Sequence, residues 1–175
     1  MRIISGYLKG KSINFVKNLK TRPLKDSVRE NIFNILKHSN LINVQIENAE
    51  ILDLYSGVGS FGIECLSRGV KKVTFVEYDI KALKILKDNL MNLSIIKKTD
   101  VFSGSVKQAL ENYNGKKFDI FFFDSPFSDE KFYQNIDYIK KNKIYKKKNV
   151  VINQREKNLN KSLKLHIEII ITEVY

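Results

Sequence analysis

Apolar runs and amphipathic stretches alternate along most of this chain. Short runs rich in β-branched and aromatic residues predict buried strands at residues 51–54, 72–76, 94–97, 118–123 and 149–152. Segments with apolar positions on one face predict helices at 61–68, 80–90, 105–111 and 130–141. Strands that alternate with helices form a mostly parallel sheet covered by helices on both faces, so the pattern predicts an α/β fold.

The first part of the chain lies outside this alternation. Two short apolar runs flank Gly6 and Gly10 and predict a β-hairpin. A helix follows, for which Asp26 is the predicted N-cap and whose apolar face begins at Val28. With 175 residues, the chain predicts one domain, made of a basic hairpin and loop (1–25) and a helix plus sheet core (26–175).

A glycine motif marks a candidate cofactor site. Gly57, Gly59 and Gly62 follow a predicted strand and open a helix, and the acidic residue Glu77 closes the next strand. A dinucleotide enzyme would share these features. Asp53, just before the motif, favours S-adenosylmethionine, because a carboxylate suits its cationic amino-acid end and would repel a pyrophosphate.

Two further candidates concern the adenine and the chemistry. Asp100, after the predicted strand 94–97, is placed to meet the adenine amino group, although it could also be a helix cap or a plain loop residue. The turn Asp124-Ser125-Pro126-Phe127 ends a buried strand. Asp124 and the Ser125 carbonyl could accept hydrogens of an exocyclic amine, Pro126 would aim that carbonyl outward, and Phe127 could stack on a flipped base. This turn predicts methyl transfer to an amino group.

Charge and cysteine content narrow the partners. The chain carries 31 Lys and Arg against 19 Asp and Glu, a net charge of +12, which suits nucleic acid, although biased composition is an alternative cause. The single Cys65 excludes an internal disulfide and a cysteine-cluster metal site. We expect no metal, because His38 and His166 have no ligand partners nearby in the sequence. No apolar run is long enough to span a membrane, and a cytoplasmic location is expected.

At these motifs the chain resembles class I S-adenosylmethionine-dependent methyltransferases, and within them the RsmD-type 16S ribosomal RNA (guanine-N2)-methyltransferases. The most specific similarity is N-terminal, in residues 2–6, Lys9-Gly10 and the stretch from Thr21 to Asn34. The resemblance implies a seven-stranded Rossmann-like fold that methylates one guanine of small-subunit rRNA. The predicted cofactor-binding residues are Asp53, Tyr55, Ser56, Gly57, Gly59, Gly62, Glu77, Tyr78, Asp100 and Val101, and the predicted RNA-binding residues are Arg2, Lys9, Lys11, Thr21, Arg22, Lys25 and Arg29.

The chain departs from the family pattern at two places. Ser125 stands where the family usually has a second proline, which gives up a fixed φ. Residues 163–175 contain no Gly or Pro turn and are too short for two strands, so the last C-terminal strand is expected to be missing or rearranged. Two alternatives stay open: a DNA adenine-N6 methyltransferase, and a catalytically weakened RNA-binding or ribosome-assembly factor. A monomer is expected.

Overall fold

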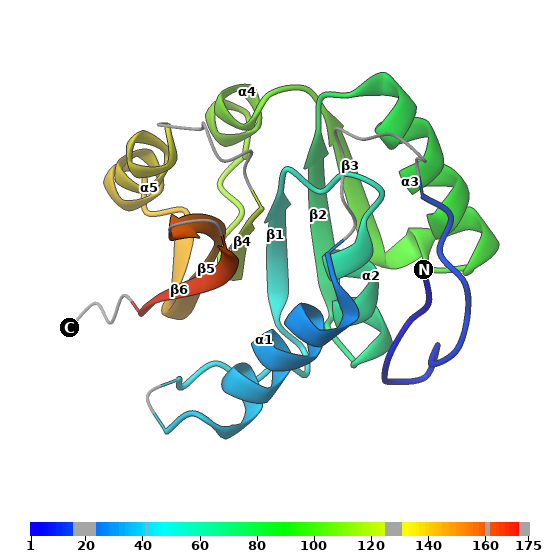
Figure 1. Ribbon diagram of the computed structural model, residues 1–175. Helices are drawn as coiled ribbons and strands as arrows, with labels where there is room; N and C mark the ends of the chain where they lie inside the picture. Colours follow the sequence, from blue (N-terminus) through cyan, green and yellow to red (C-terminus); the bar gives the residue numbers. More distant parts are fainter. Residues whose placement is uncertain (16–23, 41, 125–130, 160–161, 172–175) are drawn as a thin grey trace.

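The structure is a computed structural model that describes residues 1–15, 24–40, 42–124, 131–159 and 162–171, with the backbone alone from 155 onward. A sheet with strand order β3-β2-β1-β4-β5-β6 forms its centre (Figure 1). Strands β1 to β5 run parallel and β6 antiparallel. The strands are β1 Glu50–Leu54, β2 Lys72–Glu77, β3 Thr99–Ser103, β4 Phe118–Phe123, β5 Tyr145–Leu159 and β6 Ser162–Ile171.

Helices cover both faces of the sheet, which confirms the predicted α/β fold (Figure 1). One apolar cluster joins the sheet to α1 Asp26–His38, α2 Ser60–Ser67, α3 Ile80–Asn92 and the N-terminal hairpin. The other joins the opposite face to α4 Val106–Glu111 and α5 Phe132–Lys141. A strand buried on both faces has no polar side, which explains the unbroken apolar run of β4.

Consecutive phenylalanines of β4 point to opposite faces. Phe122 stacks on Phe61 of α2, with ring centroids 3.8 Å apart, while Phe123 meets Phe132 of α5 edge to face at 4.9 Å. Aromatic side chains therefore pack on both faces of the carboxyl end of β4. This packing fixes the position at which the chain leaves the sheet.

The N-terminal hairpin is a backbone-bonded loop packed on the core, rather than a projecting ladder of two strands. A single antiparallel bridge joins Arg2 and Ser12, and the buried side chains of Ile3, Leu8 and Ile13 belong to the core cluster. At its turn, a Cβ on Gly6 would lie 1.9 Å from the carbonyl oxygen of Ser67, so only glycine permits this close docking on α2.

A buried carboxylate anchors this hairpin. Glu64 of α2 is fully buried, and its two oxygens accept the backbone N–H groups of Ile4, at 2.8 Å, and Ser5, at 3.0 Å. The Arg68 Nε donates to the same carboxylate at 2.9 Å, which balances its charge. The hairpin is thereby ordered by the fold itself.

The predicted N-cap role of Asp26 is wrong. The N-cap of α1 is Lys25, without a side-chain cap bond, and Asp26 opens the helix. The Asp26 carboxylate instead pairs with the guanidinium of Arg29, at 2.5 Å, and Arg29 also donates to the Arg2 carbonyl at 3.0 Å. Arg29 is fully buried, so the attraction of this guanidinium outcompetes capping.

The predicted strand at 94–97 is also wrong. Ser94 has a φ of +56°, and the Ile95 N–H donates to the Leu90 carbonyl to close α3, so this apolar stretch ends a helix. A 3₁₀ turn at Ile96–Lys98 then leads into β3. The edge strand is therefore shifted towards the carboxyl end of the sequence relative to the prediction.

The end of the sheet is a long hairpin. Strand β5 pairs with β6 from Val150 opposite Ile171 to Leu159 opposite Ser162. Within the described residues one strand, β6, follows β5, where the family pattern has two strands in the C-terminal hairpin and the last was expected to be missing or rearranged. None of the helices in the described part of the chain is long and apolar enough to cross a membrane.

Replacing Glu64 by Gln should destabilise the protein by about 3 kcal/mol, because the amide cannot accept all three buried hydrogen bonds. Urea denaturation measures this loss. The matched control is Glu111→Gln, whose carboxylate is 43% exposed in a helical pair with Lys107, and it should change stability by about 0.5 kcal/mol or less. Equal losses in the two variants would contradict the anchoring role of Glu64.

Candidate functional site

Residues from four strands meet at the carboxyl edge of the sheet. Tyr55 follows β1, Glu77 ends β2, Gly104 follows β3 and Asp124 follows β4. The strand order places β1 between β2 and β4, so the order in which the parallel strands follow one another reverses at this point. Ligands of open α/β sheets bind at such a switch point, outside the carboxyl ends of the strands.

The predicted glycine motif forms the turn between β1 and α2. Gly57 and Gly59 have φ angles of +56° and +86°, which favour glycine. A Cβ on Gly59 would also lie 2.4 Å from the Leu86 side chain of α3, and one on Gly62 would lie 2.3 Å from the Phe75 ring of β2. The absence of a side chain at Gly59 thus lets the turn pack closely against α3, and its absence at Gly62 lets α2 pack on the sheet.

Glu77 clamps this turn. The Gly57 N–H donates to its Oε2 at 2.7 Å, and the N–H groups of Tyr78 and Asp79 donate to its Oε1 at 2.9 and 2.7 Å. The residue is 7% exposed. A carboxylate has about four acceptor positions, so one remains for a further donor. Glu77 is therefore able to hold the turn and to accept a ligand hydroxyl.

Asp53 contributes a buried carboxyl group beside the same turn. It is 1% exposed, and its Oδ2 accepts the Gly62 N–H at 3.1 Å. Its Oδ1 has no hydrogen-bond partner among the described residues. Burial raises the pKa of Asp53 well above its usual value, and the charges of Asp124 and Glu77 raise it further. A cationic ligand group at this oxygen would satisfy the carboxylate.

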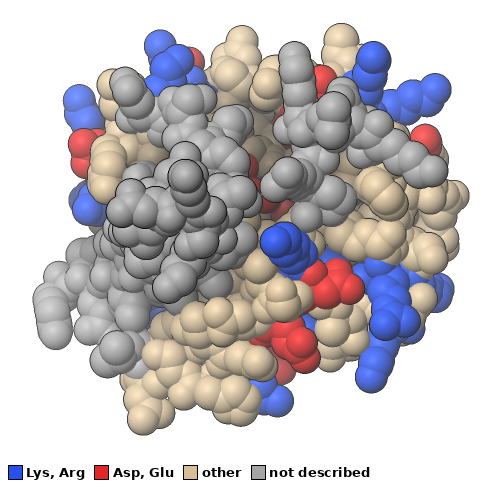
Figure 2. All heavy atoms as spheres, viewed as in Figure 1, with Lys and Arg blue, Asp and Glu red and all other residues tan. Residues whose placement is uncertain are grey.

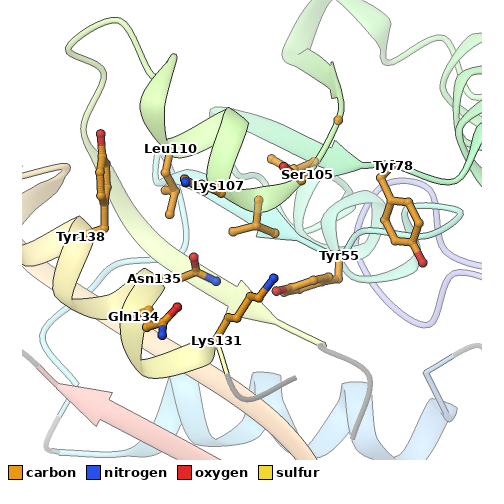
Figure 3. A pocket seen from close by; sticks show the side chains of 12 residues that line it. Tyr55, Tyr78, Ser105, Lys107, Leu110, Lys131, Gln134, Asn135 and Tyr138 are labelled. Atoms are coloured by element: carbon orange, nitrogen blue, oxygen red, sulfur yellow. The ribbon is translucent and has the colours of Figure 1, made fainter. Parts of the chain in front are cut away.

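A cavity of about 670 Å³ lies at the carboxyl ends of the strands, and its lining includes Val76 and Tyr78, the neighbours of Glu77 in the sequence (Figure 3). Tyr55 and Tyr78 stand on its strand side, with Ser105 from the start of α4 and Asn135 from α5. Further lining comes from Val76, Gly104, Val106, Lys107, Leu110, Lys131, Gln134 and Tyr138. Aromatic and apolar walls with a few polar groups suit a nucleoside.

Asp100 and Val101 do not reach this site. Asp100 is the second residue of β3 and pairs in register with Thr74, and Val101 is its central residue, pairs with Phe75 and packs against the first core cluster. The Asp100 carboxylate binds the ammonium groups of Lys72, at 3.0 Å, and Lys116, at 2.8 Å. Asp100 therefore forms structural ion pairs at the opposite edge of the sheet, instead of the predicted contact with adenine.

Gly104, Ser105 and Val106 line the cavity where Asp100 was expected. The signal that locates them is a capping box, since Ser105 and Gln108 cap α4 reciprocally. The capping box locates the start of α4 and therefore limits where β3 can end. It is a more specific signal than the apolar run at 94–97 from which the strand was predicted.

The other predicted residues fall into three groups. Asp124 lies at the carboxyl end of β4, whereas Ser125, Pro126 and Phe127 lie outside the described residues, as do Thr21 and Arg22. Arg2, Lys9, Lys11 and Lys25 are exposed, and Arg29 is buried. The burial of Arg29 excludes a phosphate contact in this conformation. Within the described segments, no group of three or more His, Cys, Asp or Glu could hold a metal ion.

The turn of the hairpin and the residues that follow it lie near different edges of the sheet. Its turn docks at Ser67, the last residue of α2, near the amino ends of the strands, where the exposed Tyr7 ring lies 5.7 Å from the Lys98 ammonium. Its later part returns to the glycine turn, through contacts of Asn14 with Asn89. Only this later part approaches the carboxyl edge.

Replacing Asp53 by Asn should flatten the pH dependence of stability. The raised pKa means that the folded state binds a proton more tightly than the unfolded state, so wild-type stability falls as pH rises from about 4 towards the folded pKa. The amide of the Asp53→Asn variant does not titrate. The unfolding free energy of the variant relative to wild type should therefore rise as the pH increases across this range. Urea denaturation at a series of pH values measures it, with the exposed Asp137→Asn as control. A difference that stays constant with pH would refute the assignment.

Comparison with known proteins agrees with this geometry. Residues 1–172 match the family model described as Conserved hypothetical protein 95. A candidate rRNA methyltransferase, YlbH of Bacillus subtilis, is 37% identical over 133 residues, which cover 75% of this chain and 69% of the relative. The ribosomal RNA small subunit methyltransferase D of Buchnera aphidicola subsp. Baizongia pistaciae is 34% identical over 161 residues, 92% of this chain and 79% of the relative.

A solved structure extends the similarity to the fold. The candidate methyltransferase yhhF of Escherichia coli superposes with a TM-score of 0.82 at 24% identity, over 99% of this chain and 98% of that one. The sequence match spans the hairpin, the glycine turn and the C-terminal strands together. The chain therefore belongs to the Conserved hypothetical protein 95 family, that of the RsmD-type methyltransferases.

Proposed function

We propose that this protein transfers a methyl group from S-adenosylmethionine to the exocyclic N2 amine of a guanine in 16S rRNA. The observation that carries the proposal is the gathering of Asp53, Glu77 and Asp124 at one edge of the sheet, where Asp53 and Glu77 are close in the sequence to the cavity-lining residues Tyr55 and Tyr78. The named function of the relatives, small-subunit rRNA methylation, supports the substrate class.

The residues present fit this cofactor. Glu77 has one acceptor position left for a ribose hydroxyl, and the Asp53 Oδ1, which has no partner among the described residues, would receive the cationic amino-acid end. Tyr55 and Tyr78 offer aromatic surface to the nucleoside, and Gly104 and Ser105 take the place first assigned to Asp100. The cofactor supplies a methyl group on a sulfonium, a strong electrophile.

Asp124 would act on the amine that receives the methyl group. The lone pair of an exocyclic amine is delocalised into the base, and acceptors that hold its hydrogens favour the pyramidal geometry needed for attack. Asp124 lies at the end of β4, beside the buried Asp53. The Ser125 carbonyl as second acceptor and Phe127 as stacking surface remain part of the proposal.

The choice of rRNA over DNA rests on the relatives more than on charge. Figure 2 shows Lys and Arg spread over the visible face with Asp and Glu among them, rather than gathered in one field. Several lysines pair with carboxylates, as Lys146 does with Glu50 at 3.1 Å and Asp119 at 2.7 Å. Tritium transfer from labelled cofactor to 16S rRNA and to DNA separates the two enzymes, and no transfer to either polymer would favour a binding factor.

Which guanine is modified follows from mapping N2-methylguanine in 16S rRNA of cells that lack the protein. A single site that loses its methyl group, and regains it on complementation, would establish guanine-N2 specificity. The proposal includes a cytoplasmic monomer, which sedimentation of the purified protein tests in part.

Replacing Asp124 by Ala should lower kcat for methyl transfer by about 100-fold or more and leave the affinity for S-adenosylmethionine within about threefold, because its acceptor role is realised on the target amine. Single-turnover methylation and calorimetry measure the two effects. Asp137→Ala, an exposed carboxylate of α5, is the control and should keep wild-type values. Full activity of Asp124→Ala would move the active site elsewhere.

Replacing Arg2, Lys9 and Lys11 together by Ala should reduce the slope of log K against log salt for rRNA binding by about 2 to 3 units, if the hairpin contacts phosphates. The control replaces Lys81, Lys84 and Lys87, three exposed lysines of α3, and removes the same charge. An equal slope in wild type and the hairpin triple mutant would mean that the hairpin is solvated and does not bind RNA.

A further inference from the structure

Asn89 of α3 joins the N-terminal hairpin to the glycine turn. The Asn14 N–H donates to its Oδ1 at 2.9 Å, and its Nδ2 donates to the carbonyls of Asn14, at 3.0 Å, and Val58, at 3.1 Å. Asn89 is 2% exposed. One buried amide thus holds backbone from two segments that are far apart in the sequence, and Figure 1 shows the N-terminal chain beside α3.

The contacts require an amide at this position. Its oxygen faces a donor, and its nitrogen faces two carbonyl oxygens. An aspartate of the same shape would set a carboxylate oxygen against both carbonyls, and a leucine would remove all three hydrogen bonds to the backbone of Asn14 and Val58. The Asn89 amide therefore binds both the N–H and the carbonyl of Asn14, as a neighbouring strand would in a sheet.

At its other end, Asn89 acts on the middle of the cofactor turn. Val58 lies between Gly57, whose N–H is bound by Glu77, and Gly59, which Leu86 contacts one helical turn before Asn89. The turn is thus held by β2 at Gly57 and by α3 at Val58. The amide that contacts the Val58 carbonyl is thus the same one that contacts the backbone of Asn14.

We propose that Asn89 is a positioning residue that couples cofactor binding to RNA binding. This inference rests on the proposed function, in which the glycine turn holds S-adenosylmethionine and the N-terminal segment binds rRNA. Cofactor that orders the turn fixes the Val58 carbonyl, which fixes the Asn89 amide and, with it, the backbone of Asn14. Coupling of this kind is reciprocal, so bound RNA strengthens cofactor binding by the same factor.

The test measures rRNA affinity of the full chain with and without saturating S-adenosylhomocysteine, which binds without reacting. In wild type, S-adenosylhomocysteine should tighten the binding of transcribed 16S rRNA by about tenfold. In Asn89→Asp the factor should fall below about twofold while each ligand alone still binds. A purely structural role would lower stability and leave this ratio unchanged.

Asn92→Asp is the matched control, because it makes the same chemical change on an exposed residue of the same helix, and it should keep the wild-type ratio. If Asn89→Asp does not fold, Asn14→Pro deletes the Asn14 N–H from the hairpin side and is read in the same way. A ratio of one in wild type, or a wild-type ratio in a folded Asn89→Asp or Asn14→Pro, would overturn the inference. Binding of neither ligand by wild type would overturn the proposed function, and this inference with it.

Discussion

The site depends on how the backbone turn after β1 is held in place. The turn has no regular ladder partner, and besides the backbone bonds of Ser56 and Gly59 its polar groups are bound by side chains. Glu77 from β2 binds Gly57, Asp53 from β1 binds Gly62, and Asn89 from α3 binds Val58. Three elements that the fold brings together, β1, β2 and α3, therefore set the shape of the glycine turn.

Two of these side chains, Glu77 and Asp53, are buried carboxylates. Hydrogen bonds offset the desolvation of Glu77 more than that of Asp53. Glu77 accepts three N–H groups, which stabilise its charge, whereas Asp53 accepts one and retains an unpartnered oxygen among the described residues. This explains the direction of the Asp53 pKa. A cation at Asp53 would compensate the burial that the protein alone does not, which gives the site a preference for a cationic ligand.

Much of this architecture could be predicted from the sequence, because its signals are local. The apolar run of β4 and the glycine motif each define an element and one of its ends. The misplacement of Asp100 came from reading Ile95 as part of a strand, where tertiary packing uses it to close α3. Asp26 was assigned as a cap because its partner, the buried Arg29, is recognisable only once the hairpin is folded against α1. The roles of Glu64 and Asn89 depend on backbone groups about 60 and 75 residues away in the chain, which no local pattern reveals.

The hairpin is the part whose interpretation changes most between sequence and structure. Its basic residues predicted RNA contacts, and in the structure Glu64 and Ser67 dock its turn on the amino side of the sheet. An ordered hairpin pays no folding entropy when RNA binds, and it delivers Asn14 to the glycine turn in a fixed position. The hairpin backbone runs from the contacts with Glu64 to the contact of Asn14 with Asn89, so a change at Glu64 should also displace Asn14 from the glycine turn.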